Sequence, residues 1–355
     1  MNKVKAIIIA IVVIGVVAIG ILIGIKTSNN KKEATTDEVQ SAANARTEDK
    51  VEEVGSEVET EVDSTEVSAS VPSGAWNMIL QPQTKQTIRM AAFLNESFGV
   101  TGGYSSTGKM HYTNDGGVTW TKNEKSGGCI YGVEIVDSDI VWVCGKMKGV
   151  SFTDPGGLRM SLDGGKTLGA TSNYETVASE CPMSFLDDKR GWISQQNKIH
   201  ETMDGGLSFI DINLPEGLSK IKGIAVYEED GNMTGCALSQ EGVLYITEDH
   251  GTNWAQSILP IGESYEGYKI GKYESAATAI RFFDMDNALV VLSVTGSNEP
   301  LVIGFRTADG GKTWSDELIC KGQGSVYLSP DGRYVTCYNS KKITVYRFDL
   351  DESNE

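Results

Sequence analysis

Aspartate carboxylates are the most regularly spaced side chains in this chain that could do chemistry. They recur in an eight-residue pattern, here called the box, (Ser/Thr)-x-Asp-(Gly/His)-Gly-x-(Thr/Ser/Asn)-(Trp/Phe/Leu), at Asp115, Asp163, Asp204, Asp249 and Asp309. Carboxylates that converge can bind a metal ion or hydrolyse a glycosidic bond. Boxes about 40 to 60 residues apart, however, belong to separate structural units. We therefore expect each aspartate to close its own turn by accepting backbone N–H groups two or three residues on, while the glycine pair supplies positive φ angles.

Histidines are the other residues that could bind a metal, but their positions do not suggest a site. His111 and His200 both stand two residues before the residue that opens a box, so they occupy one repeat position in different units. His250 replaces the first glycine of a box. The short ligand spacing of a Cys/His metal site is absent from the sequence. We expect neither a metal nor any other cofactor.

Upstream of each box lies a second recurring element, two apolar strands joined by a polar turn. Its copies begin near residues 90, 133, 183, 224, 280 and 326. A hairpin, the strand that leads to the box and the strand after the box together make a four-stranded sheet. Such sheets, repeated about every 45 residues, are typical of a β-propeller.

The two ends of the repeat array predict how the ring closes. The sixth hairpin is followed by one more strand, residues 342–348, and by no box, whereas Trp76 has box-end spacing but no hairpin before it. The strand that starts at Trp76 can therefore complete the sixth sheet and remove the open edges. We predict an all-β, six-bladed propeller of four-stranded blades with N-terminal strand closure, and a seven-bladed ring as the alternative.

The boxes and hairpins together resemble the BNR or Asp-box repeat superfamily. The hairpin from Phe185 to Trp192 and the box after it look most like the propellers related to the photosystem II stability and assembly factor. The resemblance spans roughly residues 76–348 and implies the propeller fold. It implies no single activity, since members include sialidases, other glycosidases, sorting-receptor ectodomains and assembly factors.

A sialidase-like glycoside hydrolase is the enzyme that this resemblance brings into consideration. The sialidase pocket combines three arginines, a tyrosine nucleophile paired with a glutamate, and an acidic general acid. Arg89 is the early candidate here, but it lacks the proline of the usual Arg-Ile-Pro context. The other arginines have no motif around them. We keep hydrolysis as the alternative to non-catalytic binding.

The six cysteines follow the repeat. Three of them, Cys144, Cys236 and Cys337, fall in the second strand of a hairpin, and Cys129, Cys181 and Cys320 fall just before the first strand. Packing as small apolar residues is enough to explain them. Disulfides within one blade, Cys129 with Cys144 or Cys320 with Cys337, remain open.

The first 75 residues are expected to lie outside the propeller. A short basic N-terminus, residues 1–5, precedes an uncharged apolar run over residues 6–25. At 1.5 Å per helical residue this run is about 30 Å long, enough to cross a bilayer core. Residues 26–75 have no aromatic residue and are mostly acidic, which is typical of a disordered linker. We predict an uncleaved transmembrane anchor, an acidic linker, a propeller over residues 76–349 and a polar tail over residues 350–355.

The net charge of −17 argues against nucleic acid and anionic lipid headgroups as ligands of the folded part. Lysines flank the apolar run on both sides, so the usual excess of positive charge on the cytoplasmic side indicates its orientation in the membrane only weakly. The short N-terminal flank stays inside more easily, and we place the propeller on the extracytoplasmic side of the cell membrane. The function we predict is a non-catalytic module that binds a protein or a glycan.

The longest interval between boxes runs from Asp249 to Asp309 and holds an inserted segment, residues 262–274. Propellers vary by insertion into loops, so this segment is the expected binding region. We assign ligand binding to Tyr265, Tyr268, Tyr273 and Arg281. The alternative is that the segment is a long connection whose tyrosines cap the edge of the blade.

Overall fold

The computed structural model describes residues 70–103, 109–123, 130–146, 156–169, 182–195, 197–229, 231–271, 277–322 and 324–351. The chain divides into two compact units, residues 1–65 and 66–355, and every described residue belongs to the second. The predicted anchor and most of the predicted linker lie outside the described residues. Within the described ranges, no helix has the length and apolar character needed to cross a membrane.

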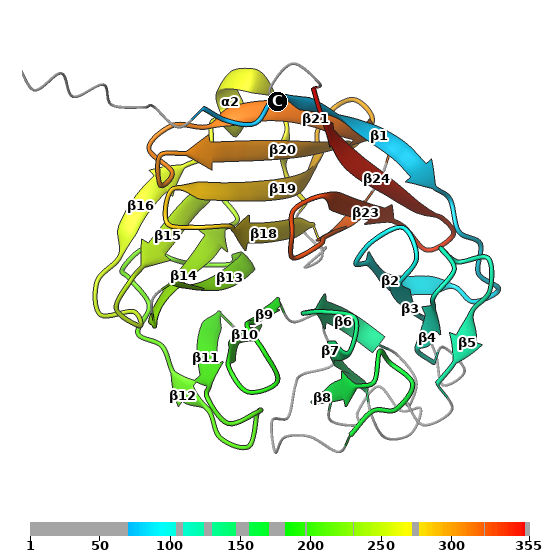
Figure 1. Cartoon of the computed structure of the whole chain (residues 1–355). Coiled ribbons are helices and arrows are strands. Elements are labelled where there is room, and N and C mark those ends of the chain that lie inside the picture. The colour runs from blue at the N-terminus through cyan, green and yellow to red at the C-terminus, as the bar shows by residue number, and fades with distance from the viewer. Residues whose placement is uncertain are drawn as a thin grey trace, which may run out of the picture. The chain divides into compact units, whose positions relative to one another are not determined.

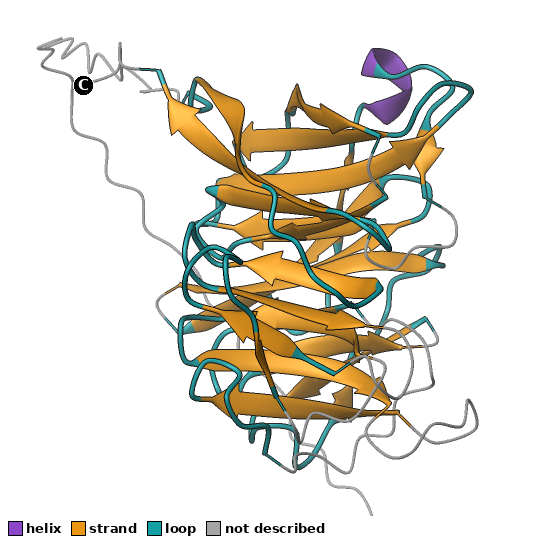
Figure 2. Ribbon diagram, turned by 90° about the vertical axis from the view of Figure 1, so that its right-hand side faces the viewer, coloured by secondary structure: helices purple, strands orange, loops and turns teal. Residues whose placement is uncertain are grey.

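Six antiparallel sheets stand around a common axis as the blades of a propeller (Figure 1). Within the first four sheets along the chain, strands that follow one another are paired, and the first strand of each hairpin lies nearest the axis (Figure 1). The prediction of six blades is confirmed, and the seven-bladed alternative was wrong. The side view shows the sheets stacked beside one another, with the short helix α2 (Ile261–Ser264) at the edge of the ring (Figure 2).

The first three blades hold eleven described strands. The first blade consists of β2 (Ile88–Phe93), β3 (Gly99–Gly103), β4 (His111–Thr113) and β5 (Thr121–Lys122). The second consists of β6 (Ile130–Ile135), β7 (Ile140–Lys146) and β8 (Gly156–Leu162). The third consists of β9 (Met183–Phe185), β10 (Gly191–Gln195), β11 (Lys198–Thr202) and β12 (Ile210–Asp211).

The last three blades complete the ring. The fourth blade consists of β13 (Ile221–Glu229), β14 (Asn232–Ser239), β15 (Val243–Thr247) and β16 (Ala255–Ile258). The fifth consists of β17 (Lys269–Ile270), β18 (Thr278–Phe282), β19 (Asn287–Thr295), β20 (Leu301–Ala308) and β21 (Ser315–Lys321). The sixth consists of β22 (Ser325–Leu328), β23 (Tyr334–Tyr338), β24 (Ile343–Leu350) and β1 (Gly74–Leu80).

The N-terminal strand closes the ring, as predicted. Strand β1 pairs antiparallel with β24, from Gly74 opposite Leu350 to Leu80 opposite Val345. Trp76 stands opposite Phe348, and their rings lie 5.2 Å apart. Because the first and last strands share one sheet, separation of the ring at this point would require β1 to leave its partner.

The last residue of a box leads into the outer strand, and its ring packs toward the preceding blade. Strands β5, β12, β16 and β21 each begin directly after a box. The indole N–H donates to an oxygen in or just after the outer strand of the preceding blade, Trp120 to Gln83 (3.0 Å), Trp254 to Asn213 (2.9 Å) and Trp314 to Ser257 (2.8 Å). These three indoles therefore link neighbouring blades.

The core lies between neighbouring sheets, where inward residues of one blade meet those of the next. Trp142 of β7 stacks on Phe185 of β9 with ring centroids 4.0 Å apart. Trp192 of β10 lies against Gly235 of β14, where an added Cβ would come within 2.1 Å of the indole. Burial of such large rings is the main term that holds adjacent blades together.

The inserted segment of the fifth blade carries regular structure in its described part, residues 262–271. It contains α2 and β17, and β17 continues the edge of β19 that β18 also occupies. Ile261 and Ile270 are buried in the core of the blade. These two apolar side chains hold α2 and β17 against the sheet.

The prediction that a Cys320–Cys337 pair would lie within one blade was wrong. Cys320 lies in β21 of the fifth blade and Cys337 in β23 of the sixth, because β21 is the last strand before the next hairpin begins. The two residues face one another across the gap between blades, in one apolar cluster. The alternative pair includes Cys129, which lies outside the described residues.

Candidate functional site

Each box aspartate closes the turn between two outer strands of its blade. In the third blade, Asp204 accepts the backbone N–H of Ser208 at 2.9 Å, the Ser208 hydroxyl at 2.6 Å and the Thr202 hydroxyl at 3.0 Å. Equivalent bonds surround the other box aspartates, Asp115, Asp163, Asp249 and Asp309.

The main backbone donor stands four residues after the aspartate, one beyond the predicted two or three, while the N–H three residues on also lowers the pKa of the aspartate, as Val118 does for Asp115. The reason lies in the glycine pair: Gly205 and Gly206 have φ values of 75° and 81°. Two successive left-handed residues carry the chain around before an N–H points back at the carboxylate. In the fourth blade His250 takes the first of these places with a φ of 54°.

These hydrogen bonds also bear on whether the aspartates could act in catalysis. Donation from the side chain and backbone of Thr119 lowers the pKa of Asp115 to about 2, and Thr313 does the same for Asp309. A carboxylate that stays ionised and is already surrounded by donors is a poor proton acceptor near neutral pH. The geometry gives these residues a role in turn structure.

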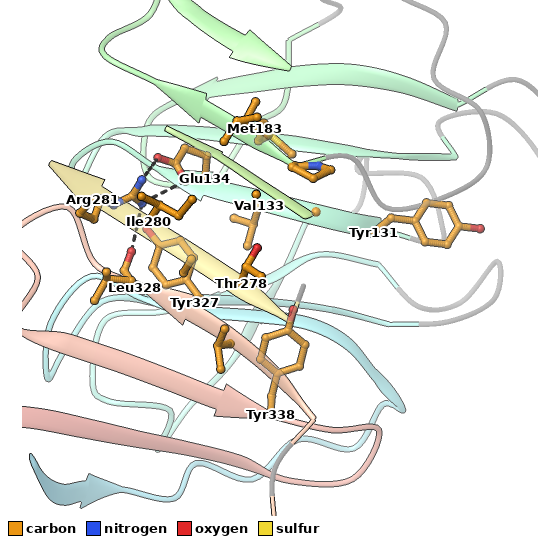
Figure 3. Close-up of a pocket in the computed structure, with 16 residues that line it drawn as sticks. Tyr131, Val133, Glu134, Met183, Thr278, Ile280, Arg281, Tyr327, Leu328 and Tyr338 are labelled. Carbon is orange, nitrogen blue, oxygen red and sulfur yellow. Dashed lines mark hydrogen bonds and ion pairs between the residues drawn. The ribbon is translucent and has the colours of Figure 1, made fainter. Parts of the chain in front are cut away.

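The central channel holds a buried cluster of charged and aromatic side chains (Figure 3). Arg281 of β18 pairs with Glu134 of β6 at 2.8 Å and also donates to the carbonyl of Leu328 at 3.0 Å (Figure 3). The second and fifth blades lie opposite one another in a six-membered ring, so this ion pair crosses the axis. The Tyr327 hydroxyl, from the sixth blade, contacts both the N–H and the carbonyl of Ile135 at 3.2 Å.

Burial dominates the electrostatics of this channel cluster. It raises the pKa of Glu134, against the opposing effect of Arg281. Burial also works to lower the pKa of Arg281, but attraction to Glu134 outweighs it and raises that pKa above the ordinary value. Burial raises the pKa of Tyr327 as well. The guanidinium therefore remains charged and bound to Glu134.

The cavity beside this cluster is small. It measures about 80 Å³ and is lined by the inner strands of five blades, with Tyr131, Thr278 and Tyr338 among its polar residues. Binding pockets for small ligands usually measure roughly 300–1,000 Å³. At about 30 Å³ per water molecule the channel cavity holds a few waters but no sugar ring.

The structure separates Arg281 from the tyrosines with which the sequence grouped it. The guanidinium lies in the channel because β18 is an inner strand, whereas Tyr265 and Tyr268 precede β17 in the inserted segment. Both tyrosines line another cavity, beside the outer strands of the fifth blade. Tyr273, the third tyrosine of the prediction, lies outside the described residues.

Tyr265 and Tyr268 are partly buried against the core of the fifth blade. The Tyr265 hydroxyl donates to Asp316 of β21 at 2.9 Å, and its ring meets Phe305 edge-on at 6.5 Å. The Tyr268 hydroxyl donates to the carbonyl of Glu299 at 3.3 Å. Burial, followed by the bond to Asp316, raises the pKa of Tyr265, which therefore stays protonated.

A cavity of about 550 Å³, here called the rim pocket, opens between these tyrosines and the ends of the outer strands. Its lining residues come from the inserted segment, the β19–β20 turn, β20 and β21: Tyr265, Tyr268, Asn298, Glu299, Leu301, Leu318 and Lys321. Leu318 is 46% exposed. Gly296 lies under the Tyr268 ring, where an added Cβ would come within 3.1 Å.

The long box interval singled out the two tyrosines in the sequence, but nothing in the sequence indicated that Leu318, Glu299 and Lys321 border the same cavity. These residues stand far along the chain, and the positions of β21 and of the β19–β20 turn beside the inserted segment bring them in. A further cavity of about 530 Å³, on the first blade, was also missed. It is lined by Lys85, His111, Lys122, Val118 and Trp120, with three neighbouring polar residues, Gln83, Thr84 and Gln86.

The described residues contain no group of three or more His, Cys, Asp or Glu side chains that could hold a metal ion. His200 bonds to Asp211 at 2.7 Å, and His111 to the carbonyl of Lys109 at 2.9 Å. His250 lies 3.3 Å from the buried Glu201. The three histidines therefore serve three separate contacts.

No protein-family model and no curated protein matches the chain. Among solved structures the chain is similar to "YCF48 bound to D1 peptide", at 14% identity over 80% of this chain and 99% of that one, with a TM-score of 0.44. It is similar to YCF48 from Cyanidioschyzon merolae, at 15% identity over 77% and 98%, with a TM-score of 0.41. It is also similar to the GH74 enzyme of Niastella koreensis, at 14% identity over 73% of this chain and 45% of that one, with a TM-score of 0.43. At such identities the similarity concerns the propeller fold alone.

Proposed function

We propose that the chain is a non-catalytic propeller that binds an extended segment of a partner protein at the rim pocket. The observation that carries this proposal is the composition of that pocket: two tyrosine rings and an exposed leucine, Leu318, beside the opposite charges of Glu299 and Lys321. An aromatic and aliphatic centre with a charged rim is the usual composition of a protein-binding surface. A volume of about 550 Å³ is large enough to hold several side chains of a ligand.

The strand beside the pocket favours a peptide over a sugar. Strand β21 pairs with β20 and is the outer strand of its sheet, so its free edge can pair with an added strand. Both tyrosine hydroxyls already bond within the protein, to Asp316 and to Glu299. They are thus less available for the many hydrogen bonds that a sugar requires, while Leu318 remains available for apolar contact.

The proposal includes an uncleaved anchor at residues 6–25 that holds the propeller on the extracytoplasmic side of the cell membrane. Its support is the uncharged apolar run and the short basic segment before it. External protease added to whole cells should cut within residues 70–351 while a cytoplasmic marker stays intact. Protection of these residues, with a known surface protein cut in the same sample, would place the propeller on the other side.

Photo-cross-linking in the producing cells tests the binding site. A photoreactive phenylalanine in place of Leu318 should join the full chain to one predominant protein, which mass spectrometry identifies. The matched control is the same substitution at Leu207, which is 70% exposed on the third blade. Adding Tyr268→Ser should reduce the cross-link at position 318 at least tenfold. Equal cross-linking from both positions, or no effect of Tyr268→Ser, would contradict the proposal.

A sialidase-like hydrolase, the alternative from sequence, has less support. Among the residues that line the channel cavity there is one arginine, Arg281, and it is already bound to Glu134. Turnover of a fluorogenic sialoside by the purified full chain would reverse this ranking. Selective binding of the chain to a glycan array, lost on Tyr268→Ser, would keep the rim pocket but change its ligand class.

A further inference from the structure

A pair of buried cysteines lies where the fifth blade meets the ring-closing sixth blade. The sulfur atoms of Cys320 and Cys337 are 3.5 Å apart. Cys320 is 8% exposed, and Cys337 is fully buried. A disulfide bond measures about 2.05 Å between sulfurs, so a shift of about 1.5 Å would bring the atoms to bonding distance.

The backbone of β21 explains why Cys320 points toward the sixth blade. Along β20, Val302 stands opposite Cys320 and the next residue, Ile303, stands opposite Leu318, so Ile319 is an extra residue in a β-bulge. Side chains normally alternate between the two faces of a strand, but Ile319 and Cys320 are both buried. Both join the apolar cluster that contains Val335 and Cys337. The bulge therefore turns Cys320 inward onto β23.

We propose that Cys320 and Cys337 form a redox site, in which oxidation to a disulfide joins the fifth blade covalently to the sixth. The bond would add a second covalent link between the two sheets, beside the chain itself, which runs from β21 into β22. It would also fasten β21, whose Leu318 and Lys321 line the rim pocket. Oxidation of the pair in the cell depends on the proposed extracytoplasmic location, whereas the reaction itself can be tested on the purified chain.

The reaction balances with a disulfide oxidant, such as oxidised glutathione or a disulfide-bearing oxidoreductase. The Cys320 thiolate attacks one sulfur of the oxidant, which forms a mixed disulfide and releases one thiolate. Cys337 then loses its proton, and its sulfur attacks the Cys320 sulfur and displaces the second thiolate. The two cysteines lose two electrons and two protons, and the oxidant takes them up as two thiols.

The environment makes Cys320 the attacking group. The hydrogen bond with Cys337 lowers the pKa of the Cys320 thiol, helped by Tyr346 and the positive charge of Lys342, while burial acts in the opposite direction. Burial raises the pKa of Cys337, which therefore suits the second step, after the mixed disulfide has formed. A thiol with a lowered pKa is the more reactive partner in exchange. Cys236, by contrast, has its pKa raised by burial within the fourth blade.

The test compares the full-length protein equilibrated in oxidised and in reduced glutathione. After unfolding in alkylating reagent without reductant, peptide mapping of the oxidised sample should show the Cys320 peptide joined to the Cys337 peptide, two hydrogen masses lighter than the separate thiols. The loop closed by the bond is short, and oxidation should raise the melting temperature by about 5 °C. Amide exchange over residues 315–321 should slow in the oxidised form.

Variants separate the proposal from general effects of oxidation. Cys320→Ser and Cys337→Ser should each abolish the linked peptide and the redox dependence of melting, whereas Cys236→Ser should retain both. Full alkylation of both cysteines after equilibration in the oxidised buffer would overturn the proposal, as would a linkage of either one to a different cysteine. Loss of partner cross-linking at Leu318 with the disulfide intact would contradict the proposed function and leave this site standing.

Discussion

The channel and the rim pocket use polar and apolar side chains in opposite ways. In the channel, Arg281 and Glu134 are buried and bound to one another across the axis, around a cavity of about 80 Å³. At the rim, Tyr268 and Leu318 border a cavity of about 550 Å³ that is open to solvent. The charged residues of the channel most resemble an active site, but the cavity beside them is too small for a ligand. The larger cavity lies beside the mostly uncharged residues of the rim.

This contrast shows why residue type alone is a weak guide to function in a propeller. Inner strands from every blade converge on the axis, so charged side chains there meet and satisfy one another. At the rim no opposite blade faces the sheet, and Leu318 of β21 remains exposed beside the inserted segment. Substitutions in the channel should therefore affect stability, and substitutions at the rim should affect binding.

The largest effect is expected from Arg281→Met. This change leaves the carboxylate of Glu134, which is 5% exposed, without its cation, and should lower the free energy of unfolding by about 3–5 kcal/mol. Chemical denaturation measures the loss. Combining Arg281→Met with Glu134→Leu should recover part of the lost free energy. Lys198 forms an exposed ion pair with Asp211, so Lys198→Ala should change the melting temperature little. A loss no larger than that of Lys198→Ala would mean that the channel pair is not structural.

A smaller loss is expected from Thr202→Val in the third box. The buried Thr202 hydroxyl accepts the N–H of Gly206 at 2.8 Å, and valine has a similar shape but no acceptor. The unfolding free energy should fall by about 1–3 kcal/mol because a buried N–H loses its partner. Thr202→Ser keeps the hydroxyl and introduces the residue type found at the same position of the second box, Ser161. It should therefore be nearly neutral. If valine and serine were equally tolerated, the hydroxyl would not be needed.

The turns should also make stability depend on acid pH. The pKa values of Asp115 and Asp309 are lowered to about 2 from an ordinary value of 3.8 by bonds to Thr119 and Thr313. A carboxylate whose pKa is lower in the folded state than in the unfolded state stabilises the fold at pH values above its unfolded pKa. This contribution is lost as the pH falls from about 4 to 2. The melting temperature should fall over that interval. Asp115→Asn with Asp309→Asn should melt lower at pH 5 and show a shallower acid slope; an unchanged slope would assign the acid sensitivity to other groups.

The smallest effect is expected from Tyr265→Phe at the rim. It removes one exposed hydrogen bond, to Asp316, and leaves the ring against Phe305, so the unfolding free energy should change by less than about 0.5 kcal/mol. Differential scanning fluorimetry compares the melting temperature of this variant with those of the unsubstituted protein and of Thr202→Val. A loss as large as that of Thr202→Val would favour the alternative in which the tyrosines cap the blade edge.

The fold was largely predictable because its signals are local. A box, a hairpin turn and a strand each depend on residues within about ten positions of one another, so the repeat predicts the six blades and their order. The unmatched strand at Trp76 predicted the closure with β24. The positive φ values of the box glycines followed from residue type as well.

The site was predictable only in part because its contacts are distant in the chain. Glu134 and Arg281 are 147 positions apart, and no local pattern indicates that they pair. Cys320 faces Cys337 only because a bulge in β21 turns it toward the next blade. Tyr265 and Tyr268 stood out in the sequence, but the exposed Leu318 joins them through the position of one strand beside the inserted segment. Local pattern thus determined the repeat, and ring closure decided which side chains meet, since closing a ring places opposite blades in contact through the axis and adjacent blades in contact through their faces.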